Sequence, residues 1–215
     1  MTEAGYLLTE FLGRDRMNVH SGGTTDMLRR GEETKERIER TALRLFVEQG
    51  VTETSIKEIA RAAGISQGAM YNHYVSKEEL AWSLFAESFS DIGQELRRRA
   101  REHATIEARL KAMVTHVFVS FDRDWLRVSY VFAARHLHLG RVTRKLGNPY
   151  MVFRTVIAEA IKRGEIPRQD PELATSLVTG ACIQVIDTKI LGRIAGPLAD
   201  RADEVASACM RLLRR

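Results

Sequence analysis

Cysteine, long apolar runs and strand-like alternation are scarce or missing in this sequence, and each absence excludes a class of protein. Among 215 residues there are 2 cysteines, and their separation fits neither a zinc motif nor a disulfide framework. No apolar run approaches the roughly 18 residues of a transmembrane helix, and the N-terminus lacks the apolar segment of a signal peptide. We therefore expect a cytoplasmic protein without a metal, a cofactor or a membrane partner, in which Cys182 and Cys209 are small core residues.

Positive charge is in slight excess, but its position along the chain weakens any argument from bulk charge. The 33 Lys and Arg residues against 28 Asp and Glu give a formal net charge of +5. Residues 31–80 nevertheless hold seven basic and nine acidic side chains, and the surplus lies in residues 97–101 and at the C-terminus. A role in nucleic-acid binding must therefore rest on individually placed residues.

The first part of the chain lacks any helical pattern. Residues 1–32 contain scattered glycines and threonines without sustained periodicity, so we expect a flexible N-terminal arm and a first helix from Glu33. Met17 and Met27 lie within this arm, and they support the hypothesis that translation starts later than Met1.

Beyond the arm, apolar residues recur at helical spacing and capping residues mark successive helix starts. An apolar stripe runs from Ile38 to Phe46, and Gly50 ends that helix. Ser55 and Ser76 each begin a capping box, with a Glu three residues later. The helix from Ser76 is expected to continue to about residue 101, and later helices over residues 105–121, 124–139, 149–163, 171–192 and 199–213. We therefore predict an all-α protein.

The stretch GISQGAMYNHY, from Gly64 to Tyr74, fits two patterns. Its G-x-S-x-G start resembles a nucleophile elbow, which would make Ser66 the attacking group of a hydrolase. That elbow requires a buried strand before the serine, whereas a capped amphipathic helix precedes Ser66, and we identify no Asp and His partners. Ser66 is better explained as the N-cap of a third helix, with Gly64 in the turn between two short helices. This is the helix-turn-helix layout, and it predicts a protein that is not an enzyme.

Side chains on and beside this third helix are predicted to meet DNA. Small residues let the helix backbone approach base edges, amide side chains read those edges, and hydrogen-bond donors nearby hold phosphates. The base-contact set is Gln67, Gly68, Ala69, Asn72 and Lys57, and the phosphate-contact set is Thr54, Ser55, Tyr71, His73, Tyr74 and Lys77. For Tyr71 and Tyr74 the alternative is packing between helices, while Met70 is assigned to the core.

The segment TALRLFVEQGVTETSIKEIARAAGISQGAMYNHYVSKEEL resembles the N-terminal DNA-binding domain of the TetR (tetracycline repressor) family of bacterial transcriptional regulators. The resemblance covers about residues 33–85 and includes A-G-I-S-x-G-x-x-Y-x-H-Y and S-K-E-x-L at fixed spacing. It implies a homodimer on a palindromic operator of double-stranded DNA, with the positions matching Gln67, Gly68, Ala69 and Asn72 on bases and those matching Tyr71, His73 and Lys77 on the backbone.

The resemblance also implies a three-helix helix-turn-helix domain (33–80) joined by the long helix after Ser76 to a C-terminal helical domain (81–215), and the arm before them (1–32) is longer than is usual in the family. The C-terminal domain would bind a small-molecule effector and dimerise through helices 171–192 and 199–213. Small and apolar residues on those helices fit such an interface, among them Leu173, Leu177, Gly180, Ala202, Val205, Ala206 and Cys209. An intramolecular core is the alternative.

Aromatic and polar residues on the middle helices are candidates for an effector pocket, although any helical core contains such residues. The candidates are His116, Phe118, Tyr130, Arg135, Phe153 and Gln184. His136 and His138 are two positions apart and point to different sides of a helix, which argues against a metal site. We expect a ligand-released repressor, with an activator or a ligand-independent regulator of the same fold as the alternative.

Overall fold

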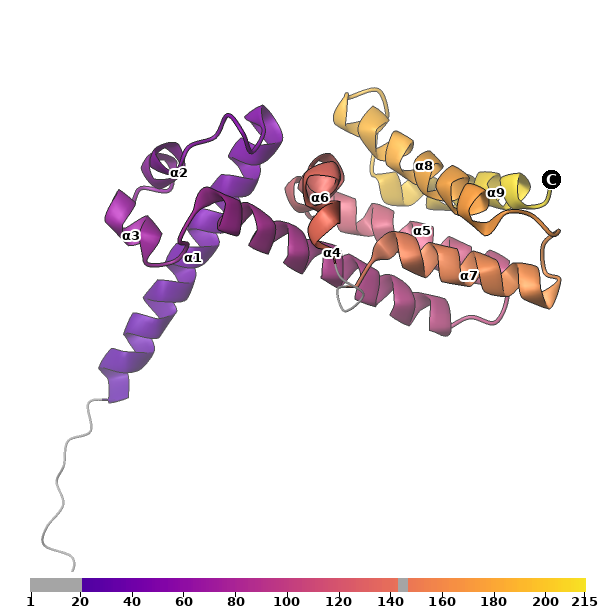
Figure 1. Ribbon diagram of the computed structural model, residues 1–215, viewed down its shortest axis with the longest axis horizontal. Helices are drawn as coiled ribbons and strands as arrows, with labels where there is room; N and C mark the ends of the chain where they lie inside the picture. The colour runs from indigo at the N-terminus through magenta and orange to yellow at the C-terminus, as the bar shows by residue number, and fades with distance from the viewer. Residues whose placement is uncertain (1–20, 143–146) are drawn as a thin grey trace, which may run out of the picture. The chain divides into compact units, whose positions relative to one another are not determined.

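The computed structural model describes residues 21–142 and 147–215, with side chains from Arg29 onward. Every regular element in these described ranges is helical, as predicted (Figure 1). The chain divides into two units, Met1–Arg37 and Ile38–Arg215, and the packing described below lies within the second. None of the helices in the described ranges combines the length and apolar character needed to cross a membrane.

The first helix starts earlier than the sequence pattern predicts. Helix α1 spans Ser21–Gln49, so the predicted boundary at Glu33 is wrong, and residues 21–32 are not an irregular arm. Local side-chain bonds support the extension, because Arg29 pairs with Glu33 at 3.2 Å and the Thr34 hydroxyl donates to the Arg30 carbonyl at 2.8 Å. Residues 1–20 of the expected arm, including Met17, lie outside the described residues.

Three short-range caps position the next helices, α2 (Ile56–Ala62), α3 (Gln67–Tyr71) and α4 (Lys77–Arg101). The hydroxyl oxygens of Ser55, Ser66 and Ser76 accept hydrogen bonds from the backbone N–H groups three residues later, at 3.2, 3.1 and 3.0 Å. These predicted N-caps are confirmed. Gly50 and Gly64 have φ of 90° and 68°, a left-handed conformation that a side chain would strain, and so permit the two sharp turns.

The N-terminal helices share one apolar core with α6 (Trp125–His138). Ile38, Ile59, Met70 and Leu80 are completely buried in it, so the prediction for Met70 is confirmed. The ring of Tyr130, from α6, stacks on Phe46 with centroids 5.6 Å apart. This core holds the helix-turn-helix together and ties it to an element far along the chain.

Among the remaining helices, α5 and α7 pack against the long helix α4, which also contacts α6, while α8 packs against α7 and α9 packs against α5 and α8 (Figure 1). The remaining helices are α5 (Ile106–Arg123), α7 (Pro149–Arg163), α8 (Pro171–Ile190) and α9 (Ala202–Leu213), with the 3-10 turns η2 (Leu139–Arg141) and η3 (Leu198–Arg201). Each predicted C-terminal helix is present, with ends that differ by a few residues. The prediction assigned residues 199–201 to the last helix. In the structure residues 198–201 form the more tightly wound 3-10 turn η3.

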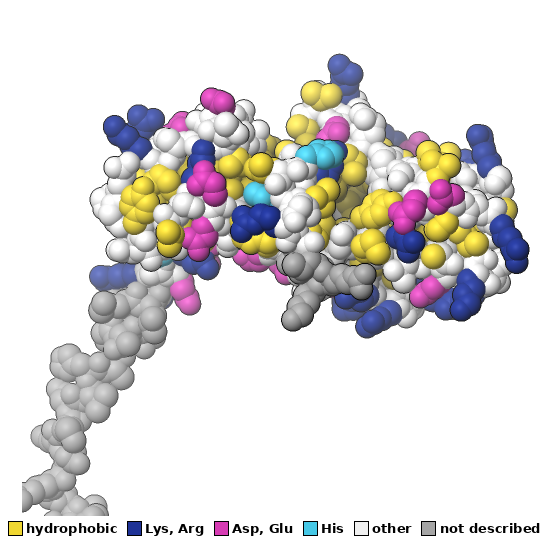
Figure 2. Space-filling model, viewed as in Figure 1, with side chains coloured by type: hydrophobic (Ala, Val, Ile, Leu, Met, Phe, Trp, Pro, Cys, Tyr) yellow, Lys and Arg dark blue, Asp and Glu magenta, His cyan; other side chains and the backbone are white. Residues whose placement is uncertain are grey.

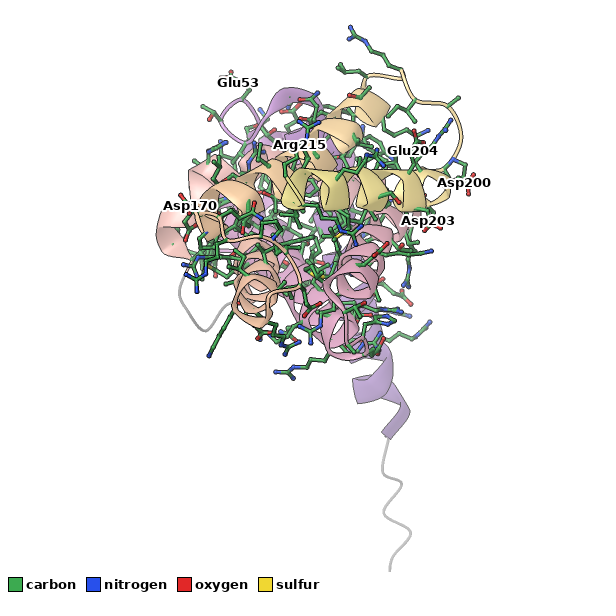
Figure 3. All side chains as sticks on the ribbon, turned by 90° about the vertical axis from the view of Figure 1, so that its right-hand side faces the viewer. Glu53, Asp170, Asp200, Asp203, Glu204 and Arg215 are labelled. Carbon is green, nitrogen blue, oxygen red and sulfur yellow. The ribbon has the colours of Figure 1, made fainter. Side chains whose placement is uncertain are left out.

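Acidic side chains lie at the start of α9. Figure 3 shows Asp200, Asp203 and Glu204 together at one end of this helix and Arg215 at the other. Negative charge near the N-terminus and positive charge near the C-terminus both interact favourably with the helix dipole. Asp203 also pairs with Lys111 of α5 at 2.8 Å, which joins α9 to its neighbour.

Candidate nucleic-acid interface and apolar cavity

The outer side of α3 presents most of the predicted base-contact residues. Gln67, Gly68 and Asn72 are exposed, and Ala69 is half-buried. A Cβ built on Gly68 would meet only the Ser66 hydroxyl, at 3.9 Å, so the fold does not require a glycine there. The missing side chain instead leaves the backbone open to close approach by a ligand from outside.

Several predicted phosphate-contact residues surround this helix on the surface. Tyr71 is 55% exposed although it is a large aromatic residue, which disfavours the alternative that it packs between helices. Ser55 is also exposed, and His73 and Lys77 are half-buried; Lys57, the fifth predicted base-contact residue, is exposed on α2. Lys77 donates to the Thr52 carbonyl at 3.0 Å, so its ammonium links the start of α4 to the turn before α2.

Two predicted phosphate contacts are corrected by their burial. Thr54 is 1% exposed and donates to the Gly50 carbonyl at 2.8 Å. Tyr74 is 5% exposed, its hydroxyl donates to the carboxylate of Glu39, and burial raises the pKa of its phenol. Neither side chain faces solvent in this structure, so both act inside the domain, and packing between helices is the correct interpretation for Tyr74.

Ser66 is held as a cap. Its hydroxyl oxygen accepts the Ala69 N–H, and helix α2 rather than a strand precedes its turn. The strained strand-to-helix turn that exposes a serine nucleophile is therefore missing from the described chain around Ser66.

An apolar cavity of about 400 Å³ lies between α4, α5, α6, α7 and α8. Figure 2 shows hydrophobic side chains gathered around a recess between α6 and the α7 and α8 helices. Of the predicted pocket residues, Arg135 and Phe153 line this cavity. Its other lining residues include Phe89, Leu96, Phe132, Tyr150, Thr179 and Cys182, which come from four helices and share no local sequence signal.

The other four predicted pocket residues lie elsewhere, which corrects their assignment. Phe118 is fully buried in the C-terminal core, and Gln184 is exposed on α8. His116 lies in a separate recess with Ser120 and Glu95, where burial lowers the pKa of its imidazole. Tyr130 belongs to the core shared with the N-terminal helices.

A small buried polar cluster joins α6 to α4. The Tyr130 hydroxyl donates to the Ala81 carbonyl at 2.8 Å and lies 3.3 Å from His138 Nε2. His138 is 3% exposed and its ring lies against Phe85, and burial lowers the pKa of its imidazole. His136 is exposed, so the two histidines point to different sides of the helix as predicted.

Helix α8 leaves an apolar side uncovered. Ala174, Val178, Cys182 and Ile186 are buried against the chain's own core. On the opposite side, Leu173 is 60% exposed and Leu177 is 46% exposed, beside the exposed Gly180. In α9, the predicted interface residues Ala202, Ala206 and Cys209 are buried in the intramolecular core, so for them the alternative is correct.

A capped three-helix unit with an exposed α3, joined by α4 to a helical domain, defines a helix-turn-helix protein. The family model for bacterial regulatory proteins of the tetR family matches residues 38–84. The HTH-type transcriptional regulator AcrR of Shigella flexneri is 39% identical over 105 residues, which are 47% of this chain and 49% of AcrR. Residues 38–84 therefore match the TetR family, and the chain spans about half the length of this curated relative.

Two solved structures have the same fold. The transcriptional regulator FadR from Bacillus subtilis, solved in complex with stearoyl-CoA, has a TM-score of 0.64 at 20% identity over 81% of this chain and 96% of FadR. AibR, solved in complex with isovaleryl coenzyme A and operator DNA, has a TM-score of 0.62 at 19% identity over 84% of this chain and 98% of AibR.

Proposed function

We propose that this protein is a transcriptional regulator that represses by occupying a palindromic operator as a homodimer and is released by a small molecule. The exposed outer side of α3 carries this proposal. Gln67 and Asn72 present amides that can pair with base edges, and Gly68 permits close backbone approach. Tyr71, His73, Ser55 and Lys57 surround them with groups for phosphates and neighbouring bases. The protein would work in the cytoplasm, beside the chromosome.

The uncovered side of α8 supports the homodimer. Leu173 and Leu177 expose apolar surface on a helix whose other side is already buried. Two copies related by a two-fold axis would cover this surface with the same surface of the partner. In α9, the half-buried Val205, Ala208 and Leu212 recur at helical spacing and can extend the contact. The dimer would then set the separation of its two α3 helices, which must match fixed operator half-sites.

Helix α4 supports a ligand response, because it belongs to both parts of the chain. Leu80 and Leu84 lie in the helix-turn-helix core, while Phe89, Ile92 and Leu96 line the cavity. A ligand that fits the cavity best when α4 is displaced would favour a dimer whose α3 helices no longer match the operator. Relatives of the same fold were solved with acyl-CoA molecules, and this chain offers a cavity to an effector of comparable apolar character.

The test is a binding assay of the purified protein on the DNA upstream of its own gene and on a genome-wide fragment pool, at two salt concentrations. We expect tight, salt-sensitive and sequence-selective binding. Tyr71→Ala should lose most of that affinity and keep its thermal stability, because Tyr71 is exposed. Absence of selective binding to any genomic fragment at low salt would refute the proposal. Transcription in vitro that rises rather than falls with bound protein would replace the repressor by an activator.

A further inference from the structure

The cavity is apolar except for a small group of polar side chains, most of which are already bonded. The Tyr150 hydroxyl donates to Glu172 Oε2 at 2.8 Å, and the Thr179 hydroxyl donates to the Thr175 carbonyl at 2.8 Å. The Asn148 side-chain oxygen caps α7 by accepting from the Met151 N–H. These groups are therefore poorly placed to supply the main recognition of a charged ligand.

Arg135 differs from these residues. Among the described lining residues it is the one that is charged at neutral pH. Its guanidinium donates to the Phe132 carbonyl of its own helix, and within the described part of the chain no carboxylate pairs with it. A guanidinium has five N–H donors. A half-buried cation beside apolar walls, with most of its donors unused, is an incomplete site for an anion.

We propose that the cavity binds an amphipathic anion with an apolar chain, and that Arg135 holds its anionic group. This rests on the proposed function and names the chemical class of its effector. The chain of the ligand would lie against Leu96, Val117 and Cys182, which are at most 6% exposed. A carboxylate and the phosphates of a coenzyme A thioester are two sources of the same chemistry, a negative group on an apolar chain.

Two relations between ligand structure and affinity follow. Each added methylene should tighten binding about fourfold until the cavity is full. An alcohol of the same chain length buries the same apolar surface but offers Arg135 no charge, so it should bind about 10-fold to 100-fold more weakly than the carboxylate.

The experiment measures ligand affinity by calorimetry without DNA, so that its outcome does not depend on operator binding. The ligands are hexanoate, octanoate and decanoate, octan-1-ol and decan-1-ol, and decanoyl-CoA. The variants are Arg135→Gln and a matched control, Arg97→Gln, which removes the same charge from an exposed position of α4 outside the cavity. We expect Arg135→Gln to lower the affinity for the anions at least about 10-fold and to leave the affinity for the alcohols unchanged. Arg97→Gln should leave the affinities for both kinds of ligand unchanged.

Binding of decanoyl-CoA but not of decanoate, lost in Arg135→Gln, supports the proposal with phosphate as the anion. Binding of decanoate that is lost in Arg135→Gln supports the proposal with a carboxylate as the anionic group. The proposal would be overturned by any of three outcomes. The alcohol and the carboxylate could bind with equal affinity, Arg135→Gln could lower both affinities equally, or no anion could bind. In the last case selective DNA binding would still leave the regulator itself established.

Discussion

A substitution at Gly68 is expected to affect DNA binding without affecting folding. Because a Cβ at this position meets only the Ser66 hydroxyl at 3.9 Å, Gly68→Ala should keep or slightly raise the thermal stability. The added methyl group would hold α3 away from the bases, so we expect operator affinity to fall by about 10-fold, the loss of about one base-specific contact. Thermal unfolding and DNA titration of the same preparation measure the two effects.

Gly93 is the matched control, since it has the opposite environment. A Cβ on Gly93 would lie 2.7 Å from the backbone of Gly147, so Gly93→Ala forces α4 and the segment before α7 apart. We expect it to lower the free energy of unfolding by about 1–3 kcal/mol. If Gly68→Ala destabilised the protein as much as Gly93→Ala, the interpretation of Gly68 as a DNA-facing position would be wrong.

The burial of the Tyr74 hydroxyl leads to a prediction opposite to that from its assignment as a phosphate contact. Tyr74→Phe removes the hydrogen bond to Glu39, and the loss of a partly buried bond to a charged group should cost about 1–3 kcal/mol of unfolding free energy. Operator affinity, measured well below the unfolding temperature, should stay within about twofold because the hydroxyl does not reach solvent. Tyr71→Phe is the control, with stability kept and affinity lowered. Normal stability with lost DNA binding in Tyr74→Phe would restore the original assignment.

At the scale of helices, sequence reasoning worked where the pattern was local. Capping serines predicted the starts of α2, α3 and α4, and apolar periodicity predicted α5 to α8 within a few residues, because both signals come from residues within the same helix or next to it. The sequence of residues 21–32 carries no apolar stripe, so periodicity could not indicate the start of α1. Thr54 and Tyr74 were misplaced because their exposure depends on which neighbours cover them. Four of the six predicted pocket residues lie outside the cavity because five helices that are distant in sequence build it.

Helix α6, like α4, connects the cavity to the helix-turn-helix core. Phe132 and Arg135 line the cavity, whereas Tyr130 lies in the shared core and bonds to Ala81 of α4. Tyr130→Phe keeps the ring but removes that bond. We expect ligand affinity in the absence of DNA to be unchanged, while the factor by which ligand weakens operator binding falls several-fold.

The coupling factor is measured by DNA titration with and without saturating decanoate or decanoyl-CoA, whichever binds. Ser83→Ala, a small change on the same helix as Ala81, provides a comparison outside this bond. An unchanged coupling factor in Tyr130→Phe would show that the hydrogen bond only stabilises the fold.

At the scale of the whole molecule, the exposed leucines of α8 decide whether the protein can bind a two-fold symmetric site. In an isolated subunit Leu173 and Leu177 face water, so replacing both by Lys should leave the folded subunit intact while placing like charges against each other across the proposed two-fold axis. We expect the double variant to sediment as a monomer at concentrations where the natural sequence is a dimer. Its affinity for a full operator should fall to that for a half-site, at least about 100-fold weaker, because the two subunits would no longer bind the two half-sites as one molecule.

Val119→Lys is the control, since Val119 is 45% exposed on α5 and a charge there should leave both sedimentation and affinity unchanged. A double variant that stays dimeric would place the interface on another face, and one that becomes monomeric yet binds the full operator normally would show that dimerisation does not set the spacing of the α3 helices.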